Sequence, residues 1–332
     1  MPATLAAFVN GVLAHSLDYD DTHLPSVLHP SASVVPAALA AAQAAGADGQ
    51  ALISAVAAGL EVCVRTGMAG YDQDARNSTF FDHGQHATSI CGALGGAVSA
   101  AVLLGLDAVG VTNALGIAAS MAAGLIEANR TGGTVKRMHC GWAAHSAVSA
   151  AQLAAEGFTG PPTVLEGRFG FYQAWLHGQF DPAAITDGLG ETWLVPDIFF
   201  KPYPANHFTH TAIDAAIELR SRGLRPEDVV VAGAGGAGLT AAVTAADRGS
   251  TVLNLEPRPT FRHDGNTAMS TGMIPAAGTR WQRAAGIEDS ACRPWPVRAR
   301  SAAGAARRGR AASQHHLHGR LNRMGSWSPG PS

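Results

Sequence analysis

The stretch from residue 10 to residue 36 reads Asn-Gly-Val-Leu-Ala-His-Ser-Leu-Asp-Tyr-Asp-Asp-Thr-His-Leu-Pro-Ser-Val-Leu-His-Pro-Ser-Ala-Ser-Val-Val-Pro. It places three carboxylates, three imidazoles and several hydroxyls between two apolar segments. Polar groups at this density between apolar helices must be hydrogen-bonded, solvated or functional. The stretch therefore predicts a polar loop between two helices, which is either an ordinary connection or part of a site.

The segments around this loop favour helices. Their apolar residues recur at helical spacing, and sustained two-residue alternation is absent up to residue 228. Gly46 follows an alanine-rich run and marks a helix end. The sequence predicts a mainly α domain over residues 1–228, with helices at 1–16, 33–45, 49–67, 87–106, 108–126, 143–156 and 210–222.

Two of the expected helices, 87–106 and 108–126, carry no charge and are long enough to cross a bilayer. They are rich in glycine, alanine and serine, and the mean hydropathy of the chain is only +0.08. We therefore expect buried helices that pack closely through small residues, and we expect no membrane partner.

The composition limits the classes of function. Of 332 residues, 47% are hydrophobic and 14% are charged, which allows a large core. The net charge of −2 gives no general attraction to nucleic acid. The four cysteines lie far apart without a C-x-x-C pair, which argues against a disulfide framework or a metal site built on paired cysteines. The sequence has no recognisable signal peptide, and we expect a cytoplasmic location without a metal site.

A second polar cluster, His83-Gly-Gln-His-Ala-Thr88, begins the uncharged segment 87–106. Helix N-termini present free N–H groups and partial positive charge, so this position favours an anionic substrate. The alternative is that His86 only caps the helix.

A third cluster runs from Gly132 to Ser146 and contains two glycines, Lys136, Arg137 and His139 before a helix expected from Ala143. Flexible backbone, two cations and a helix start are suited to binding a carboxylate, although a solvated basic turn is the alternative. The chain has 23 basic residues, of which only Lys136 and Lys201 are lysines. An ammonium is a compact charge that can lose its proton, unlike a guanidinium.

In this order the clusters resemble the MmgE/PrpD family, which includes 2-methylcitrate dehydratase and cis-aconitate decarboxylase. The matching pieces are Asp18-Tyr-Asp-Asp-Thr22-His, His29-Pro-Ser, Gly84-Gln-His86-Ala-Thr, Lys136-Arg-Met-His139, the helix expected over 141–157, and Lys201-Pro-Tyr203-Pro. The resemblance implies a large helical domain with a smaller lid domain, a homodimer, and elimination or decarboxylation of a small tricarboxylic acid without a cofactor. It points to a site formed by Asp18, Thr22, His29, His86 and Lys136, with His139 and Tyr203 as further candidates.

The chemistry of these residues agrees with that reaction class. Eliminating water beside a carboxylate requires a base for the α proton, an acid for the leaving hydroxyl and cations for the substrate. His29 and His86 suit the proton transfers because imidazole titrates near neutrality. Lys136 suits carboxylate binding, while Asp18 and Thr22 suit orientation of a histidine or of the substrate.

Residues 229–290 change in character where a lid is expected. A strand runs into Gly233-x-Gly235-x-x-Gly238, and after a helix a second strand, 251–256, ends at Glu256. This context is typical of dinucleotide binding, with glycines at the pyrophosphate and Glu256 on ribose hydroxyls. The segment resembles the FAD-binding start of fumarate reductase and succinate dehydrogenase flavoproteins. One βαβ unit cannot enclose the isoalloxazine, so we expect no stable FAD binding.

The tail from residue 291 to residue 332 has eight arginines and no acid, and its composition predicts disorder. Nucleic acid is not the expected partner, because the tail resembles out-of-frame translation of GC-rich sequence. Three hypotheses remain open: an MmgE/PrpD-type lyase, an FAD-dependent oxidoreductase fragment, and an inactive truncated or chimeric remnant whose lid is absent or replaced.

Overall fold

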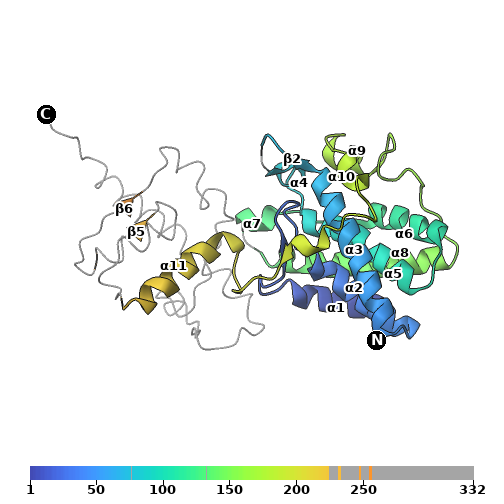
Figure 1. The fold of residues 1–332 in the computed structure, drawn as a ribbon. Coiled ribbons are helices and arrows are strands. Elements are labelled where there is room, and N and C mark those ends of the chain that lie inside the picture. Colours follow the sequence, from blue (N-terminus) through green and yellow to red (C-terminus); the bar gives the residue numbers. More distant parts are fainter. Residues whose placement is uncertain (76, 132, 224–230, 233–246, 248–253, 256–332) are drawn as a thin grey trace.

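The computed structural model describes residues 1–75, 77–131 and 133–223, together with 231–232, 247 and 254–255. Its helices are α1 (Ala3–Ala14), α2 (Ser31–Ala45), α3 (Gly49–Ala69), α4 (Thr79–Asp82), α5 (Ala87–Leu103), α6 (Ala108–Met121), α7 (Glu127–Thr131), α8 (Val135–Ala155), α9 (Phe171–Leu176), α10 (Ala183–Thr186) and α11 (His210–Ser221), with 3-10 turns at Val195–Asp197 and His207–Thr209. The mainly α prediction is confirmed (Figure 1).

The strands in the described residues are two residues long and form separate pairs. The antiparallel pairs are β1 (Thr22–His23) with β4 (Ile198–Phe199) and β2 (Tyr71–Asp72) with β3 (Asn77–Ser78). The parallel pair is β5 (Val231–Ala232) with β6 (Asn254–Leu255), in the register Val231 opposite Asn254. The first pair matters most for the site, because it joins segments about 175 positions apart.

Helix α5 is the centre of the fold. Every residue of this helix except Val102 is buried, and it packs against α2, α3, α6 and α8. Helix α1 closes the bundle by packing on α2 and α8. A helix surrounded in this way has to be apolar on all sides, which explains the absence of charge in its sequence.

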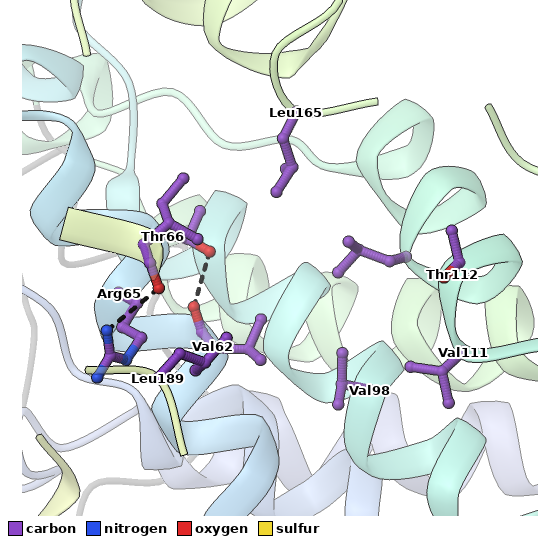
Figure 2. A pocket seen from close by; sticks show the side chains of 10 residues that line it. Val62, Arg65, Thr66, Val98, Val111, Thr112, Leu165 and Leu189 are labelled. Carbon is purple, nitrogen blue, oxygen red and sulfur yellow. Dashed lines mark hydrogen bonds between the residues drawn. The ribbon is translucent and has the colours of Figure 1, made fainter. Parts of the chain in front are cut away.

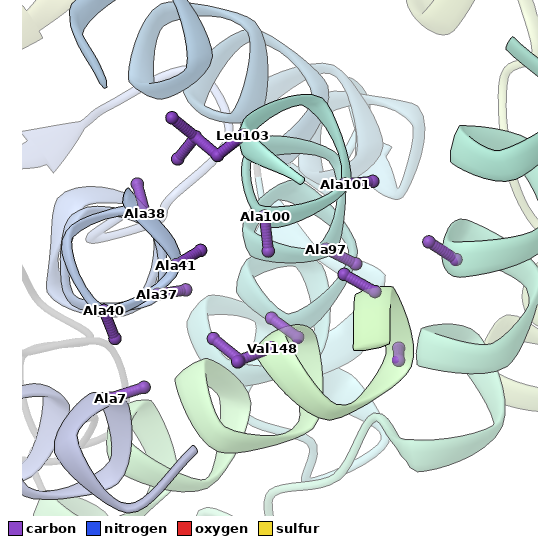
Figure 3. Close-up of a cluster of buried hydrophobic side chains, with 14 of the residues drawn as sticks. Ala7, Ala37, Ala38, Ala40, Ala41, Ala97, Ala100, Ala101, Leu103 and Val148 are labelled. Atoms are coloured by element: carbon purple, nitrogen blue, oxygen red, sulfur yellow. The ribbon is translucent and has the colours of Figure 1, made fainter. Parts of the chain in front are cut away.

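Much of the core consists of alanine. Buried alanines of α1, α2, α5 and α8 form one cluster, which also contains Val148 of α8 and Leu103 of α5 (Figure 3). A second cluster holds the larger side chains, among them Phe80, Phe171 and Tyr172. Small side chains let helix axes approach closely, so the prediction of buried helices packed through small residues is confirmed for the segment that forms α5.

Glycines mark the points where helix backbones touch. A Cβ atom added to Gly95 of α5 would lie 2.3 Å from the carbonyl oxygen of Gly59 in α3, and one added to Gly59 would lie 2.5 Å from that of Gly95. At the contact of α1 with α8, a Cβ atom on Gly11 would lie 2.8 Å from the Cα atom of Gly141. The atoms that each added Cβ would meet belong to the backbone of the neighbouring helix. Backbone atoms, unlike a flexible side chain, cannot rotate away from the contact.

We therefore expect Gly95→Val to lower the free energy of unfolding by at least about 1–3 kcal/mol, the usual cost of overpacking. Gly49→Ala is the matched control, because Gly49 begins α3 and a Cβ atom there would meet nothing within 4 Å. Urea unfolding followed by circular dichroism measures both. Equal midpoints for Gly95→Val and wild type would contradict the close approach of α3 and α5.

Helix α3 has 21 residues and is apolar enough to cross a bilayer by length and composition alone. Half of its most apolar window is buried inside the fold, and it carries the buried pair Glu61 and Arg65. A helix in the core of a protein can have the same length and apolar composition, and α3 packs along α5. The expectation of no membrane partner stays a prediction.

Two helix boundaries differ from the predictions by five residues or more, and the others differ by at most three. Helix α8 begins at Val135 rather than Ala143, so Lys136 and His139 belong to the helix and not to a loop before it. The local reason is that lysine, arginine and methionine favour helix, and burial of His139 and Cys140 against the core fixes this turn. Helix α6 ends at Met121 instead of residue 126.

The C-terminal predictions are tested only in part. The parallel pairing of β5 with β6 is the arrangement expected of two strands in a βαβ unit. Apart from residue 247, which is helical, the predicted helix between them lies outside the described residues, as do Gly233, Gly235, Gly238, Glu256 and the tail 291–332. The division into 1–228, 229–290 and 291–332 stays a prediction.

Candidate functional site

The polar loop before α2 is fixed by a helix-terminal hydrogen bond. The Asp21 carboxylate accepts a hydrogen bond of 2.5 Å from the Ser31 hydroxyl and bonds of 3.2 Å from its backbone N–H. An anion at this position satisfies a free N–H of the helix start. Burial raises the pKa of Asp21 to about 6. Asp21 therefore anchors the loop to the start of α2.

The pairing of β1 with β4 brings Lys201 to the same loop. The Lys201 ammonium is fully buried and lies 2.8 Å from Oδ1 of Asp18, 3.0 Å from the Asp18 carbonyl oxygen and 3.4 Å from Oδ1 of Asp20. Asp18 has a φ of 54°, in the left-handed region, where its carbonyl and its carboxylate both face the ammonium. Burial alone would raise the pKa of Asp18, but Lys201 outweighs burial and lowers it.

His15 pairs with the other side of Asp20. Its Nδ1 lies 2.5 Å from Oδ2 of Asp20, and both side chains are buried. Burial acts to lower the pKa of His15, but Cys140 and Asp20 outweigh it and raise that pKa to about 10. The pKa of Asp20 is correspondingly held well below its usual range by His15 and other cations, against the effect of burial. Asp20 thus lies between two cations, His15 and Lys201.

The hydrogen bonds of His29 define its tautomer. Nδ1 lies 2.7 Å from the carbonyl oxygen of Asp21 and 3.2 Å from Oγ1 of Thr22. A carbonyl oxygen can only accept, so Nδ1 carries the proton and the lone pair of the neutral ring is on Nε2. Burial lowers the pKa of His29 to about 4, which leaves the ring neutral at pH 7. His29 is therefore a base with a defined free nitrogen.

His86 and His139 form a second imidazole pair. Their Nδ1 atoms are 3.1 Å apart, so one neutral ring donates to the other, and both side chains are buried. Burial is the main cause that lowers the pKa of each. His86 occupies the N-cap position of α5, but its side chain makes no capping hydrogen bond. The alternative, in which the His86 side chain only caps the helix, is therefore wrong.

Lys136 lies at the start of α8, beside these rings. Its charge contributes to the lowered pKa values of Asp18, His86 and His139. The half-buried side chain therefore adds positive charge to the same region that contains the neutral imidazoles. Such a region can bind a carboxylate and take a proton from the same molecule.

Tyr203 is placed differently. Its hydroxyl donates to Oδ1 of Asp214 at 2.5 Å, and its ring meets that of His210 edge-on. Both partners belong to α11, which projects from the helical bundle (Figure 1). Of the predicted residues, the structure groups Asp18, Thr22, His29, His86, Lys136 and His139, whereas the contacts of Tyr203 are with α11.

Three residues of the cluster were not predicted: His15, Asp20 and Lys201. The scarcity of lysine was a usable signal for Lys201, because only two lysines occur in the chain. No local pattern distinguishes His15 and Asp20 from the other polar residues of their loop. Their importance follows only from the distances of 2.5 and 3.4 Å that join them to each other and to Lys201.

A cavity of about 250 Å³ lies elsewhere, between α3, α5, α6 and the segment around residues 165–189. Figure 2 shows mainly aliphatic side chains around it, with Arg65 and Thr66 at one side. None of the predicted site residues lines this cavity.

Metal and cofactor chemistry can be considered for the described residues only. Within residues 1–75, 77–131 and 133–223, no group of three or more histidine, cysteine or acidic residues is arranged to hold a metal ion. The parallel β5–β6 pair fits the start of a dinucleotide-binding unit as far as it is described. The candidate site itself contains cations, neutral imidazoles and an anchored carboxylate, which suit binding of a carboxylic acid with proton transfer.

Comparison with known proteins divides the chain at about residue 228. Residues 228–315 match the FAD binding domain family. In this region the chain is 52% identical over 63 residues to NADH:fumarate oxidoreductase of Klebsiella pneumoniae (strain 342), a match that covers 19% of this chain and 7% of that protein.

The first part matches proteins of a different kind. The chain is 35% identical over 244 residues to human cis-aconitate decarboxylase, covering 69% of this chain and 48% of that enzyme. It is 31% identical over 228 residues to cis-aconitate decarboxylase of Aspergillus terreus, covering 65% of this chain and 45% of that enzyme. The chain therefore spans about half the length of the curated relatives it matches here. Residues 1–183, more than half of the chain, match the MmgE/PrpD N-terminal domain, and the chain belongs to the MmgE/PrpD family.

Proposed function

We propose that this chain is a lyase that acts on a small tricarboxylic acid, with cis-aconitate and 2-methylcitrate as the first substrates to test. The observation that carries the proposal is the position of neutral His29 and the neutral His86–His139 pair near two lysine ammonium groups. The cis-aconitate decarboxylases to which the chain is similar support the choice of substrate class.

The same groups serve either reaction of this class. In a dehydration, Nε2 of His29 takes the proton from the carbon beside a carboxylate, and the hydroxyl leaves as water after it receives a proton from a second group. In a decarboxylation, the carbon–carbon bond to one carboxylate breaks, carbon dioxide leaves, and the remaining electron pair takes a proton that the imidazoles relay from water. Lys136 balances the negative charge of the remaining carboxylates in both cases.

The experiment is incubation of the full chain with each acid separately, followed by proton NMR of the mixture. Conversion of cis-aconitate to a product with one carboxylate fewer supports decarboxylation. Replacement of the methyl doublet of 2-methylcitrate by the singlet of a methyl group on a double bond supports dehydration. A folded chain that converts neither acid rejects the proposal and favours the inactive remnant.

An FAD-dependent oxidoreductase fragment is the second candidate, and the match of residues 228–315 to the FAD binding domain favours it. Bound FAD would supply hydride chemistry. The matched flavoprotein is covered over only 7% of its length, so we expect no stoichiometric flavin in the purified chain. A visible absorption spectrum with flavin peaks at one FAD per chain would contradict this expectation. The homodimer and the cytoplasmic location stay predictions.

A further inference from the structure

His15 is the most unusual of the buried histidines. Its side chain is about 2% exposed, and its Nδ1 lies 2.5 Å from Oδ2 of Asp20. Within the described part of the chain, its buried Nε2 has no hydrogen-bond partner. A buried imidazole that bonds a carboxylate at this distance is favoured in its charged form.

Asp20 is well placed to keep that charge. Its second oxygen lies 3.4 Å from the buried Lys201 ammonium, so the carboxylate is held ionised between two cations. Removing such a carboxylate would leave an unpaired buried charge, and His15 would then release its proton.

The ring of His15 is central among the other imidazoles. Its centroid is 5.4 Å from that of His86 and 6.0 Å from that of His29, and His86 is 5.0 Å from His139. A positive charge at these distances disfavours a second one on the neighbouring rings. The titratable groups that face this region are Asp18, Asp20, His29, His86, Lys136, His139, Cys140 and Lys201.

We propose that the His15–Asp20 pair is a fixed buried ion pair whose histidinium keeps His86 in its neutral, proton-accepting form. His15 is then a positioning residue that acts through its charge. The burial of His15 excludes water, so its charge acts on the neighbouring rings with little screening. This inference rests on the proposed function, in which a neutral histidine takes a proton from the substrate.

The test does not need turnover. The full chain is labelled with ¹⁵N-histidine, and the imidazole nitrogens are followed by long-range proton–nitrogen NMR between about pH 5 and pH 8. We expect one imidazole whose two nitrogens are both protonated across this range. The signal of this imidazole should disappear in His15→Gln. In Asp20→Asn it should become that of a neutral ring, in which only one of the two nitrogens carries a proton.

The neighbouring rings provide the second measurement. In His15→Gln, His29 and His86 should take up protons at higher pH, by about half a unit to two units at these separations. In Asp20→Asn, His86 should do the same because His15 loses its charge. Asp20 itself raises the pKa of His29, so only His86 reports on this second variant. His23→Gln is the matched control. His23 belongs to the same loop, is fully buried and also has an unpartnered Nε2, but burial lowers its pKa so that its loss removes no charge.

Asp20→Asn keeps the size of the side chain and carries the test if His15→Gln does not fold. Absence of a protonated imidazole in the wild type would overturn the inference, and so would equal titration of His86 in wild type and Asp20→Asn. A chain that converts no tricarboxylic acid but shows these shifts supports the ion pair and rejects only the proposed function.

Discussion

Replacing His29 with alanine is expected to lower kcat/KM for the tricarboxylic acid by about two to four orders of magnitude, the usual contribution of a general base. Nδ1 of His29 is occupied by the Asp21 carbonyl oxygen, so only Nε2 can take the proton. The ring is neutral because burial lowers its pKa to about 4. Steady-state kinetics with the substrate identified by NMR measure this loss.

The pH dependence of kcat/KM provides a second test of His29 as the general base. Since the pKa of His29 lies below its ordinary value of 6.5, wild-type kcat/KM should stay high as the pH falls through 6.5 and decline only toward the lowered pKa. His145→Ala is the control, because that histidine bonds the Thr4 carbonyl at the contact of α8 with α1. Near-normal turnover of His29→Ala would remove this residue from the mechanism.

Replacing Arg65 with methionine is expected to lower the free energy of unfolding by about 3–5 kcal/mol. Arg65 pairs with Glu61 at 2.7 Å, and both side chains are at most 4% exposed. The guanidinium also donates to the carbonyl oxygens of Ile185, Asp187 and Thr192, while Oε2 of Glu61 accepts from two backbone N–H groups at residues 194 and 195. The variant would leave a buried carboxylate without its cation.

The chain offers a matched pair for comparison. Glu218 and Arg222 have the same four-residue spacing on α11, but both side chains are more than 60% exposed. Glu218→Ala should therefore change stability by less than about 1 kcal/mol. Thermal unfolding of both variants tests the difference. Similar melting temperatures for Arg65→Met and Glu218→Ala would contradict the conclusion that the buried pair stabilises the contact between α3 and residues 185–195.

Much of the fold could be predicted because its signals are local. Gly46 ends α2 with a φ of 65°, as expected, and the uncharged segment from residue 87 became a buried helix. The start of α8 could not be placed in the same way. The two glycines before Lys136 resemble a loop, and only the packing of His139 and Cys140 against the core extends the helix to Val135.

The site was predicted less completely than the fold. His29 and His86 were predicted because each lies in a motif that resembles the family and because imidazole titrates near neutrality. Lys201 reaches Asp18 only because Thr22 pairs with Phe199, and a two-residue strand has no sequence signature. The ion pair of His15 with Asp20 depends on side-chain directions within one loop, which composition does not specify.

The contact between Asp18 and Lys201 also has a consequence for the order of folding. It joins residues 183 positions apart through two strands of two residues each. Contacts at such separation form late, since the chain between them must first lose its freedom. We expect the helices around α5 to reach their native packing before the ammonium reaches the loop. During refolding, native helix content should therefore return earlier than the ability to bind an anionic ligand, and the helical core would serve as the template on which the site is completed.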